Sequence, residues 1–470
     1  MADTHKNYHP DLPNTWTLAR ARQALANKEV TLEEIYTAVD KAVAQTNNLN
    51  IYLARDTKTL TKAHQRAELP LSGLPIAVKD NFCTKDLTTT ASSNVLREFI
   101  PPFDSTVVSK LEQGGGVILG KTNLDAWAHG SSTETSDFGR TLNPRSPDYL
   151  PGGSSGGSTA AVAADTCIAA IGSETAGSIR QPAAWCGVVG LKPTYGRCSR
   201  FGVAAMASST DSPGPIAKTV EDACLVFEQI AGHDPYDSTT ANQPVPKLTE
   251  QLNKGVKGLK IGWLYSDIQE LSASHKLIEK ELAVFESLGA RVEPIKALDP
   301  HYAVSVYTIV QRTEVSSNLG RYSGIRYGSE RSNFGNEAKR RVMLGTFTSA
   351  KGYADKYYLT AQKVRTLFRQ DFDQLFAKYD LLIGLTSPGF AKKIGATEGQ
   401  AMFGELEDML LEPSSITGLP GLNVPCYRDP LTNLYLGLNI IAPMWREDLM
   451  VRAGHAYEQA TEWNSWRIDK

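Results

Sequence analysis

Two short turns rich in glycine and serine are the residues of this chain most suited to chemistry. They are Gly152–Ser158, which reads GGSSGGS, and Gly172–Ser178, which reads GSETAGS. Glycine lets the backbone pass close to a substrate, and serine hydroxyls at a fixed separation can pass a proton along. Such clusters are often plain linkers, but the spacer between these two, AAVAADTCIAAIG, is apolar and small. It predicts a buried helix leading into a strand, and therefore a pair of catalytic loops.

A lysine upstream supplies the base that such loops need. The segment Leu74–Asn81 (LPIAVKDN) reads as a buried strand that ends in Lys79. Lysine is rarely fully buried unless it is paired or has lost its proton, although a lone lysine at a strand end is usually solvated. Together with two serine-rich turns, Lys79 suggests a Ser–Ser–Lys relay. In such a relay a neutral lysine is the base, one serine relays the proton and a second serine attacks.

These segments resemble the amidase signature family, whose motif is a GGSSGGS turn followed by a turn of the form G-S/T-D-T-G-G-S-I-R. The resemblance implies that Lys79 is the base, Ser154 the bridging serine held by a cis peptide bond, and Ser178 the acylated nucleophile. The backbone N–H groups expected to meet the oxyanion are those of Thr175, Ala176 and Gly177.

The resemblance also implies the fold, which is α/β, with a large mostly parallel or mixed central sheet covered by helices on both faces. It implies one domain over residues 1–470, with a core from about 15 to 465. Alternating helical and strand-like segments agree with a layered α/β core, and Thr31 with Glu34 fits a capping box. The predicted helices are Thr17–Ala26, Thr31–Gln45, Asp104–Gln113, Thr219–Ala231 and His275–Leu288, and the predicted strands include Val117–Leu119 and Leu259–Leu264.

Longer blocks narrow the resemblance to one branch of the family, the glutamine-hydrolysing subunits of tRNA-dependent amidotransferases. The blocks include VILGKTNLDAWAHGSSTETSDFGRTLNP, KRRVMLGTF and AQKVRTLFRQDFD. This branch implies that the chain releases ammonia from glutamine. The ammonia would amidate Glu-tRNA(Gln) held mainly by a partner, with Asp-tRNA(Asn) left open as a second acceptor. It further implies two partner subunits, B and C, and ATP and Mg in a partner, with no cofactor or metal in this chain.

Two charged residues carry the implied glutamine selectivity. By resemblance, Arg365 in AQKVRTL holds the α-carboxylate, which a guanidinium can grip with two hydrogen bonds. Asp408 in GELEDMLLEP aligns with the aspartate that receives the α-ammonium group, and Glu405 and Glu407 are rivals for that role.

Two positions in the nucleophile turn depart from the family motif. Glu174 stands where the motif has aspartate, which lengthens a carboxylate expected to tie the turn together. Ala176 stands where the motif has glycine, and alanine does not readily adopt a positive φ. Activity is expected to survive both changes, and glutamine selectivity is the property they put in question.

Other chemistries have weaker support in the sequence. Residues Gly115–Thr122 (GGVILGKT) match the P-loop pattern, but a P-loop turn lies between a strand and a helix, whereas here the order is helix, turn, strand. His129, in WAHGSS, is either a packed loop residue or part of the pocket wall. The histidines carry no triad motif, and no cluster of His, Cys, Asp and Glu has metal-ligand spacing.

Composition agrees with a globular enzyme. Charged residues make up 21% and the formal net charge is −2, so the chain has no general basic character for gripping RNA. The apolar runs are too short for a membrane span, the first residues show no targeting pattern, and six scattered cysteines suit free thiols in a reducing cytoplasm. Two alternatives stay open. One is a stand-alone amidase for small amides, and the other, an inactive scaffold, is disfavoured because all three relay residues are present.

Overall fold

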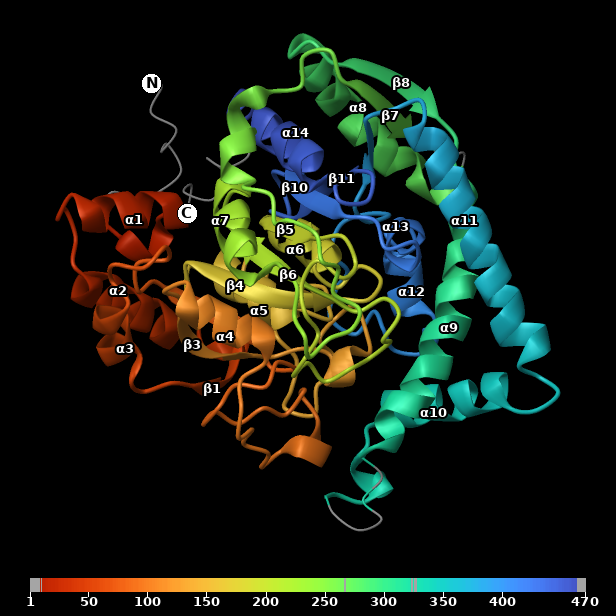
Figure 1. Cartoon of the computed structure of the whole chain (residues 1–470), viewed down its shortest axis with the longest axis horizontal. Helices are drawn as coiled ribbons and strands as arrows, with labels where there is room; N and C mark the ends of the chain where they lie inside the picture. Colours follow the sequence, from red (N-terminus) through yellow and green to blue (C-terminus); the bar gives the residue numbers. More distant parts are fainter. Residues whose placement is uncertain (1–8, 10, 266–267, 323, 325–327, 463–470) are drawn as a thin grey trace.

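The computed structural model describes residues 9, 11–265, 268–322, 324 and 328–462, and Figure 1 shows their arrangement. The helices are α1 (Leu18–Ala26), α2 (Leu32–Gln45), α3 (Thr59–Gln65), α4 (Thr106–Gln113), α5 (Gly156–Ala163), α6 (Arg180–Cys186), α7 (Val220–Ile230), α8 (Ser272–Ser287), α9 (Pro300–Gly320), α10 (Asn336–Ser349), α11 (Thr360–Phe376), α12 (Phe403–Glu407), α13 (Glu412–Ile416) and α14 (Glu447–Ala460). The strands are β1 (Tyr52–Arg55), β2 (Pro75–Lys79), β3 (Val117–Thr122), β4 (Ala169–Glu174), β5 (Val189–Lys192), β6 (Ser212–Ala217), β7 (Lys260–Leu264), β8 (Arg291–Ile295), β9 (Leu381–Leu385), β10 (Gly421–Arg428) and β11 (Tyr435–Ile441).

All these strands join one mixed sheet in the order β1-β3-β2-β4-β6-β5-β10-β11-β9-β7-β8. The mixed α/β fold is therefore confirmed, but four of its ten strand pairings are parallel and six are antiparallel. Strand β2 pairs in parallel with both β3 and β4. The carboxyl ends of these three strands therefore meet at one edge, where ligands bind in α/β sheets.

Helices cover both faces of this sheet. Neighbouring residues on β2 point to opposite faces, because side chains alternate along a strand. Ile76 and Val78 join a core with α4, α7, α8 and α14, whereas Ala77 joins a second core with α5 and α6. Since both faces of β2 are covered, Lys79 at its end is completely buried.

A third layer stands beside the sheet, where α9 packs against α10, α11 and α13 (Figure 1). These helices share an apolar cluster with the segment Leu124–Ala128. Their contacts also bury two arginines, Arg312 on α9 and Arg341 on α10. This helical layer thus brings charged side chains from distant parts of the sequence toward the loops at the sheet edge.

Local sequence signals located several elements correctly. The capping box at the start of α2 is present, with the Thr31 hydroxyl accepting from the Glu34 N–H. The order helix, turn, strand predicted around the P-loop match is confirmed, since the segment runs from the turn after α4 into β3. Across the described residues, no helix combines the length and apolar character needed to cross a membrane.

Candidate active site

Lys79 and Ser154 meet at the carboxyl end of β2. The Lys79 Nζ donates to the Ser154 Oγ across 2.8 Å, and both residues are completely buried. Ser154 lies in the first Gly/Ser turn, just before α5, and the Gly153–Ser154 peptide bond is cis. The structure therefore forms the base-to-relay contact of the predicted Ser–Ser–Lys arrangement.

Burial makes the Lys79 amine easier to deprotonate. Desolvation lowers its pKa to about 7, although the negative charges of Asp125, Asp211 and Glu174 partly oppose this shift. Burial disfavours the charged form of an amine, and no carboxylate forms an ion pair with Lys79 among the described residues. At neutral pH a large fraction of Lys79 can therefore accept a proton.

Ser173 and Asn81 hold the lysine amine from the other side, and the sequence analysis assigned neither of them a role. The Lys79 Nζ donates to the Ser173 carbonyl and hydroxyl oxygens, each at 3.1 Å. The Asn81 side-chain amide donates to the same hydroxyl at 2.9 Å. Asn81 lies in the predicted strand segment Leu74–Asn81, and Ser173 lies in the second Gly/Ser turn. Their place in these two segments was the sequence signal that could have identified them.

The nucleophile turn follows β4 and contacts the first turn directly. The Ser155 N–H donates to the Ser178 carbonyl at 3.2 Å, and Ser178 is 4% exposed. Within the described part of the chain, no hydrogen bond joins the Ser154 and Ser178 hydroxyls. Catalytic hydrogen bonds often tighten only when substrate binds. The structure thus forms the first contact of the relay and leaves the second as a prediction.

The backbone of this turn presents free donors. Among the described residues, the N–H groups of Thr175, Ala176 and Gly177 donate to no other protein group. Free, preorganised N–H groups of this kind stabilise the oxyanion of an acyl-transfer transition state. The geometry is consistent with the role predicted for these three residues.

Glu174 fixes the turn from within. Its carboxylate accepts hydrogen bonds from the backbone N–H groups of Ile179 and Arg180, both at 3.1 Å, and forms a buried ion pair with the Arg180 guanidinium at 2.6 Å. The longer side chain therefore reaches across the whole turn. Ala176 does not adopt a positive φ, so this turn does not need glycine at that position.

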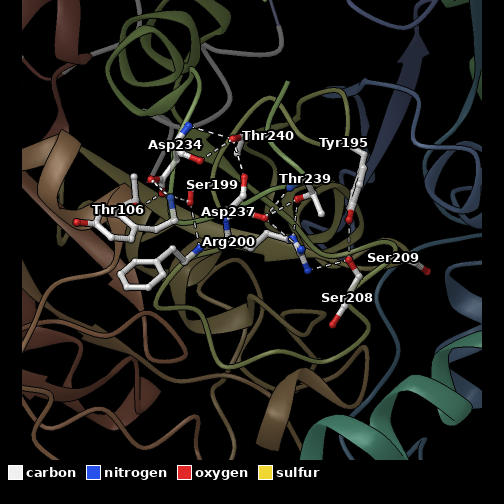
Figure 2. Close-up of polar contacts among 12 residues, drawn as sticks. Thr106, Tyr195, Ser199, Arg200, Ser208, Ser209, Asp234, Asp237, Thr239 and Thr240 are labelled. Atoms are coloured by element: carbon white, nitrogen blue, oxygen red, sulfur yellow. Dashed lines mark hydrogen bonds and ion pairs between the residues drawn. The ribbon is translucent and has the colours of Figure 1, made fainter. Parts of the chain in front are cut away.

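A second loop supports the turn from the side of β6. The Thr175 hydroxyl donates to Asp211 at 2.8 Å, and burial raises the pKa of Asp211 to about 6. The loop before Asp211 is held by the network shown in Figure 2, where Arg200 and Tyr195 both donate to the Ser208 carbonyl at 2.7 Å. The Arg200 guanidinium is itself paired with Asp237. This network fixes the position of Ser209, the next residue along the chain.

Arg365, on α11, reaches that loop. Its guanidinium donates to the hydroxyl and carbonyl oxygens of Ser209, at 3.1 and 3.0 Å, and to the Ile416 carbonyl at the end of α13. A guanidinium has five N–H donors, so two remain for a carboxylate. The structure places Arg365 between two elements that contact the nucleophile turn, but not in contact with Asp408.

Asp408 lies directly against the nucleophile turn. A Cβ atom added to Gly177 would come within 2.3 Å of its Oδ1 atom, which has no hydrogen-bond partner among the described residues. The other oxygen accepts from the Ser131 hydroxyl at 2.8 Å, and burial raises the pKa of Asp408 well above its usual range. The rivals are engaged elsewhere, since Glu405 pairs with Arg312 at 2.7 Å and Glu407 with Lys392 at 3.5 Å.

His129 is completely buried, and neither ring nitrogen has a hydrogen-bond partner in the described part of the chain. Burial, reinforced by the positive charges of Arg341 and Arg312, lowers its pKa well below the usual value. It is therefore an uncharged side chain beside the helical layer. No group of three or more potential metal ligands occurs among the described residues.

A mixed α/β sheet with a buried contact between a lysine amine and a serine hydroxyl is characteristic of one class of amide-cleaving serine hydrolases. The chain belongs to the amidase family, as the resemblance predicted, since the family model described as Amidase matches residues 8–451.

Two kinds of relative stand out. The A subunit of the glutamyl-tRNA(Gln) amidotransferase of Microcystis aeruginosa is 44% identical, with 95% of this chain and 98% of the relative covered. The relative of the same name from Moorella thermoacetica is 43% identical over 94% and 96%. The crystal structure of the corresponding protein of Thermotoga maritima superposes with a TM-score of 0.80, 35% identity and 95% of both chains covered. The peptide amidase of Stenotrophomonas maltophilia superposes with a TM-score of 0.81, 29% identity and 94% and 96% coverage.

Proposed function

We propose that this chain is the glutamine-hydrolysing subunit of a glutamyl-tRNA(Gln) amidotransferase. The observation that carries amide hydrolysis is the buried contact between Lys79 and Ser154, beside a turn whose N–H groups are free. Asp408 and Arg365, placed around the same turn, support glutamine as the amide. The relatives named above support the particular complex, because they match over almost their whole length.

The chemistry follows from these positions. Neutral Lys79 takes a proton from Ser154, which takes one from Ser178, and the Ser178 Oγ forms a bond to the side-chain amide carbon of glutamine. The N–H groups of Thr175, Ala176 and Gly177 receive the oxyanion. The relay then returns the proton to the leaving nitrogen, so that the C–N bond breaks, ammonia departs and a glutamyl ester remains on Ser178. Water cleaves this ester, which gives glutamate and restores the serine.

The other half of the reaction belongs to partners. We assign ATP and Mg to a partner subunit, and binding of Glu-tRNA(Gln) mainly to subunits B and C in the cytoplasm. The near-neutral charge of this chain supports this division, because an RNA-gripping chain is usually basic. The strand position of the P-loop match also supports it, since that segment forms β3 and not a phosphate-binding turn.

Helix α10 offers a surface for one of these subunits. It buries Ala338, Arg341 and Gly345, and turns Met343 and Phe347 outward, 73% and 44% exposed. An apolar helix face turned toward solvent is typical of a protein-binding site. Changing both outward residues to glutamate should block co-purification with subunits B and C. The same change at Leu431, which is 94% exposed in the connection between β10 and β11, should not.

Reconstitution tests the proposal. The isolated chain should release ammonia from glutamine slowly, and amidated tRNA should form only with ATP and both partner subunits. Amidated tRNA produced by this chain with ATP alone would overturn the assignment.

A stand-alone amidase is the second candidate function, and the superposition with the peptide amidase is the observation that supports it. Rapid hydrolysis of many unrelated amides by the isolated chain, with no gain from subunits B and C, would establish that alternative.

A further inference from the structure

Glu412, the first residue of α13, is a carboxyl group without a hydrogen-bond partner. It is completely buried, and neither of its oxygens accepts a hydrogen bond from any described residue. Burying an ionised carboxylate is costly unless it is paired and hydrogen-bonded. Burial and the neighbouring charge of Asp408 raise the pKa of Glu412 well above its usual range. A buried group in this condition is suited to a ligand that brings a positive charge.

The nearby arginines are already paired with other acids. Arg312 forms an ion pair with Glu405 at 2.7 Å, and Arg341 forms one with Glu337 at 2.6 Å. The Arg341 guanidinium also lies 3.6 Å from Glu405, so Glu405 is shared between the two arginines. Among the described residues, Glu412 forms no ion pair with either arginine, so its carboxyl group is not their direct counter-ion.

The second unmatched carboxyl lies one helical turn before Glu412. The Glu412 N–H donates to the Asp408 carbonyl at 3.0 Å, which places the two side chains on consecutive turns. The Oδ1 atom of Asp408 also has no partner among the described residues, and it lies against Gly177 in the nucleophile turn. Asp408 thus lies beside the nucleophile turn, and Glu412 lies one helical turn further along the chain.

Other buried polar groups in and beside the helical layer also lack a hydrogen-bond partner in the described part of the chain. His129 and Gln311, 0% and 1% exposed, have no hydrogen-bond partner on any side-chain nitrogen or oxygen within the described residues. The charges that act on His129 are those of Arg341, Glu337 and Arg312, and the same two arginines act on Glu412. Unpartnered polar groups from a loop and from α13, His129 and Glu412, therefore lie near the same two arginines, as expected for a polar ligand site and not for an apolar core.

We propose that Glu412 and Asp408 together form the subsite for the α-ammonium group of the substrate, with Glu412 as a specificity-determining residue. This inference rests on the proposed function, because it requires an amide substrate that carries an amino group. A primary ammonium has three N–H donors and can bridge two carboxylates. An amide without that group would gain nothing from the two carboxyls, so the site favours the substrate that carries it.

The test compares two amides that differ only in the α-amino group, L-glutamine and glutaramate. Glu412→Gln keeps the shape of the side chain and removes its charge. It should raise KM for glutamine by about 30-fold or more, with kcat changed by less than about threefold, and leave KM for glutaramate unchanged. The matched control is Glu407→Gln, which changes a neighbouring acid that pairs with Lys392 and should shift neither KM.

The outcomes separate this inference from the proposed function. If Asp408→Asn discriminates between the two amides and Glu412→Gln does not, the inference is wrong and glutamine hydrolysis stands. If the wild-type enzyme itself does not prefer glutamine to glutaramate, both fail. Should Glu412→Gln not fold, Glu412→Met removes the charge from a side chain of similar length, and a KM for glutamine equal to that of the wild type would also overturn the inference.

Discussion

Two lysines in this molecule are both completely buried and their pKa values are lowered alike, yet only one of them contacts serine hydroxyls. Lys79 and Lys192 are both completely buried, and burial lowers the pKa of each to about 7. The Lys79 amine contacts the hydroxyls of Ser154 and Ser173. Within the described residues, the Lys192 amine donates only to the carbonyl oxygens of Leu419 and Pro193, at 2.7 and 3.2 Å.

The difference between the two lysines is whether the groups they contact can give the amine a proton. A hydroxyl both donates and accepts, so it can pass a proton to a neutral amine, whereas a carbonyl oxygen only accepts. A perturbed pKa in a buried group is therefore a weak guide to function until its contacts are known. Lys192 ties β5 to the chain before β10, and Lys79 faces the two serine-rich turns.

The largest expected effect comes from breaking the relay itself. Ser178→Ala should abolish glutamine hydrolysis, and Lys79→Ala and Ser154→Ala should reduce kcat by about 100-fold to 10,000-fold. Lys192→Met should leave kcat within about threefold of the wild type, measured by ammonia release. Full turnover by purified Ser178→Ala would contradict the relay. An equal loss of kcat in folded Lys79→Ala and Lys192→Met would show that the two lysines do not differ in function.

A smaller effect separates proton transfer from substrate binding. Arg365→Ala and Asp408→Ala should raise KM for glutamine far more than for a simple aliphatic amide, since loss of a buried charge partner costs about 2–5 kcal/mol. Lys192→Met serves again as the control, because it touches neither residue. If both substrates suffer equally, Arg365 and Asp408 are structural, and the hypothesis of a stand-alone amidase gains support.

The pH profile gives a third comparison. The base that we propose is neutral Lys79, so kcat/KM should fall about tenfold per pH unit below pH 7 and level off above it. Glutaramate is the substrate of choice, because its binding does not depend on the ionisation of Asp408 and Glu412. Lys192→Met should keep the same midpoint. A profile that is flat between about pH 5.5 and pH 8.5, or a midpoint that moves in the Lys192 variant, would contradict the assignment of the base.

The sequence predicted what depends on short-range pattern. The Gly/Ser turns, the strand ending in Lys79 and the capping box at Thr31 all depend on neighbouring residues. The antiparallel neighbours of β4 and β5 were not predictable in this way, because strand register is set by contacts across the whole sheet. Glu412 was missed for the same reason, since its surroundings come from α9, α10 and α12 and are assembled only by the fold.

The smallest expected effect tests whether the turn around Ser178 depends on the alanine that departs from the family motif. Ala176→Gly should change kcat/KM by less than about threefold, because Ala176 has no positive φ to relieve and glycine adds only about 0.5–1 kcal/mol of backbone freedom. The pH midpoint assigned to Lys79 should not move, since Ala176 does not contact the amine.

Gly177→Ala is the opposite change one residue later, and its new Cβ atom would lie 2.3 Å from the Asp408 Oδ1 atom. It should therefore raise KM for glutamine strongly, and equal effects of the two changes would show that the space beside Asp408 has no special importance for the substrate.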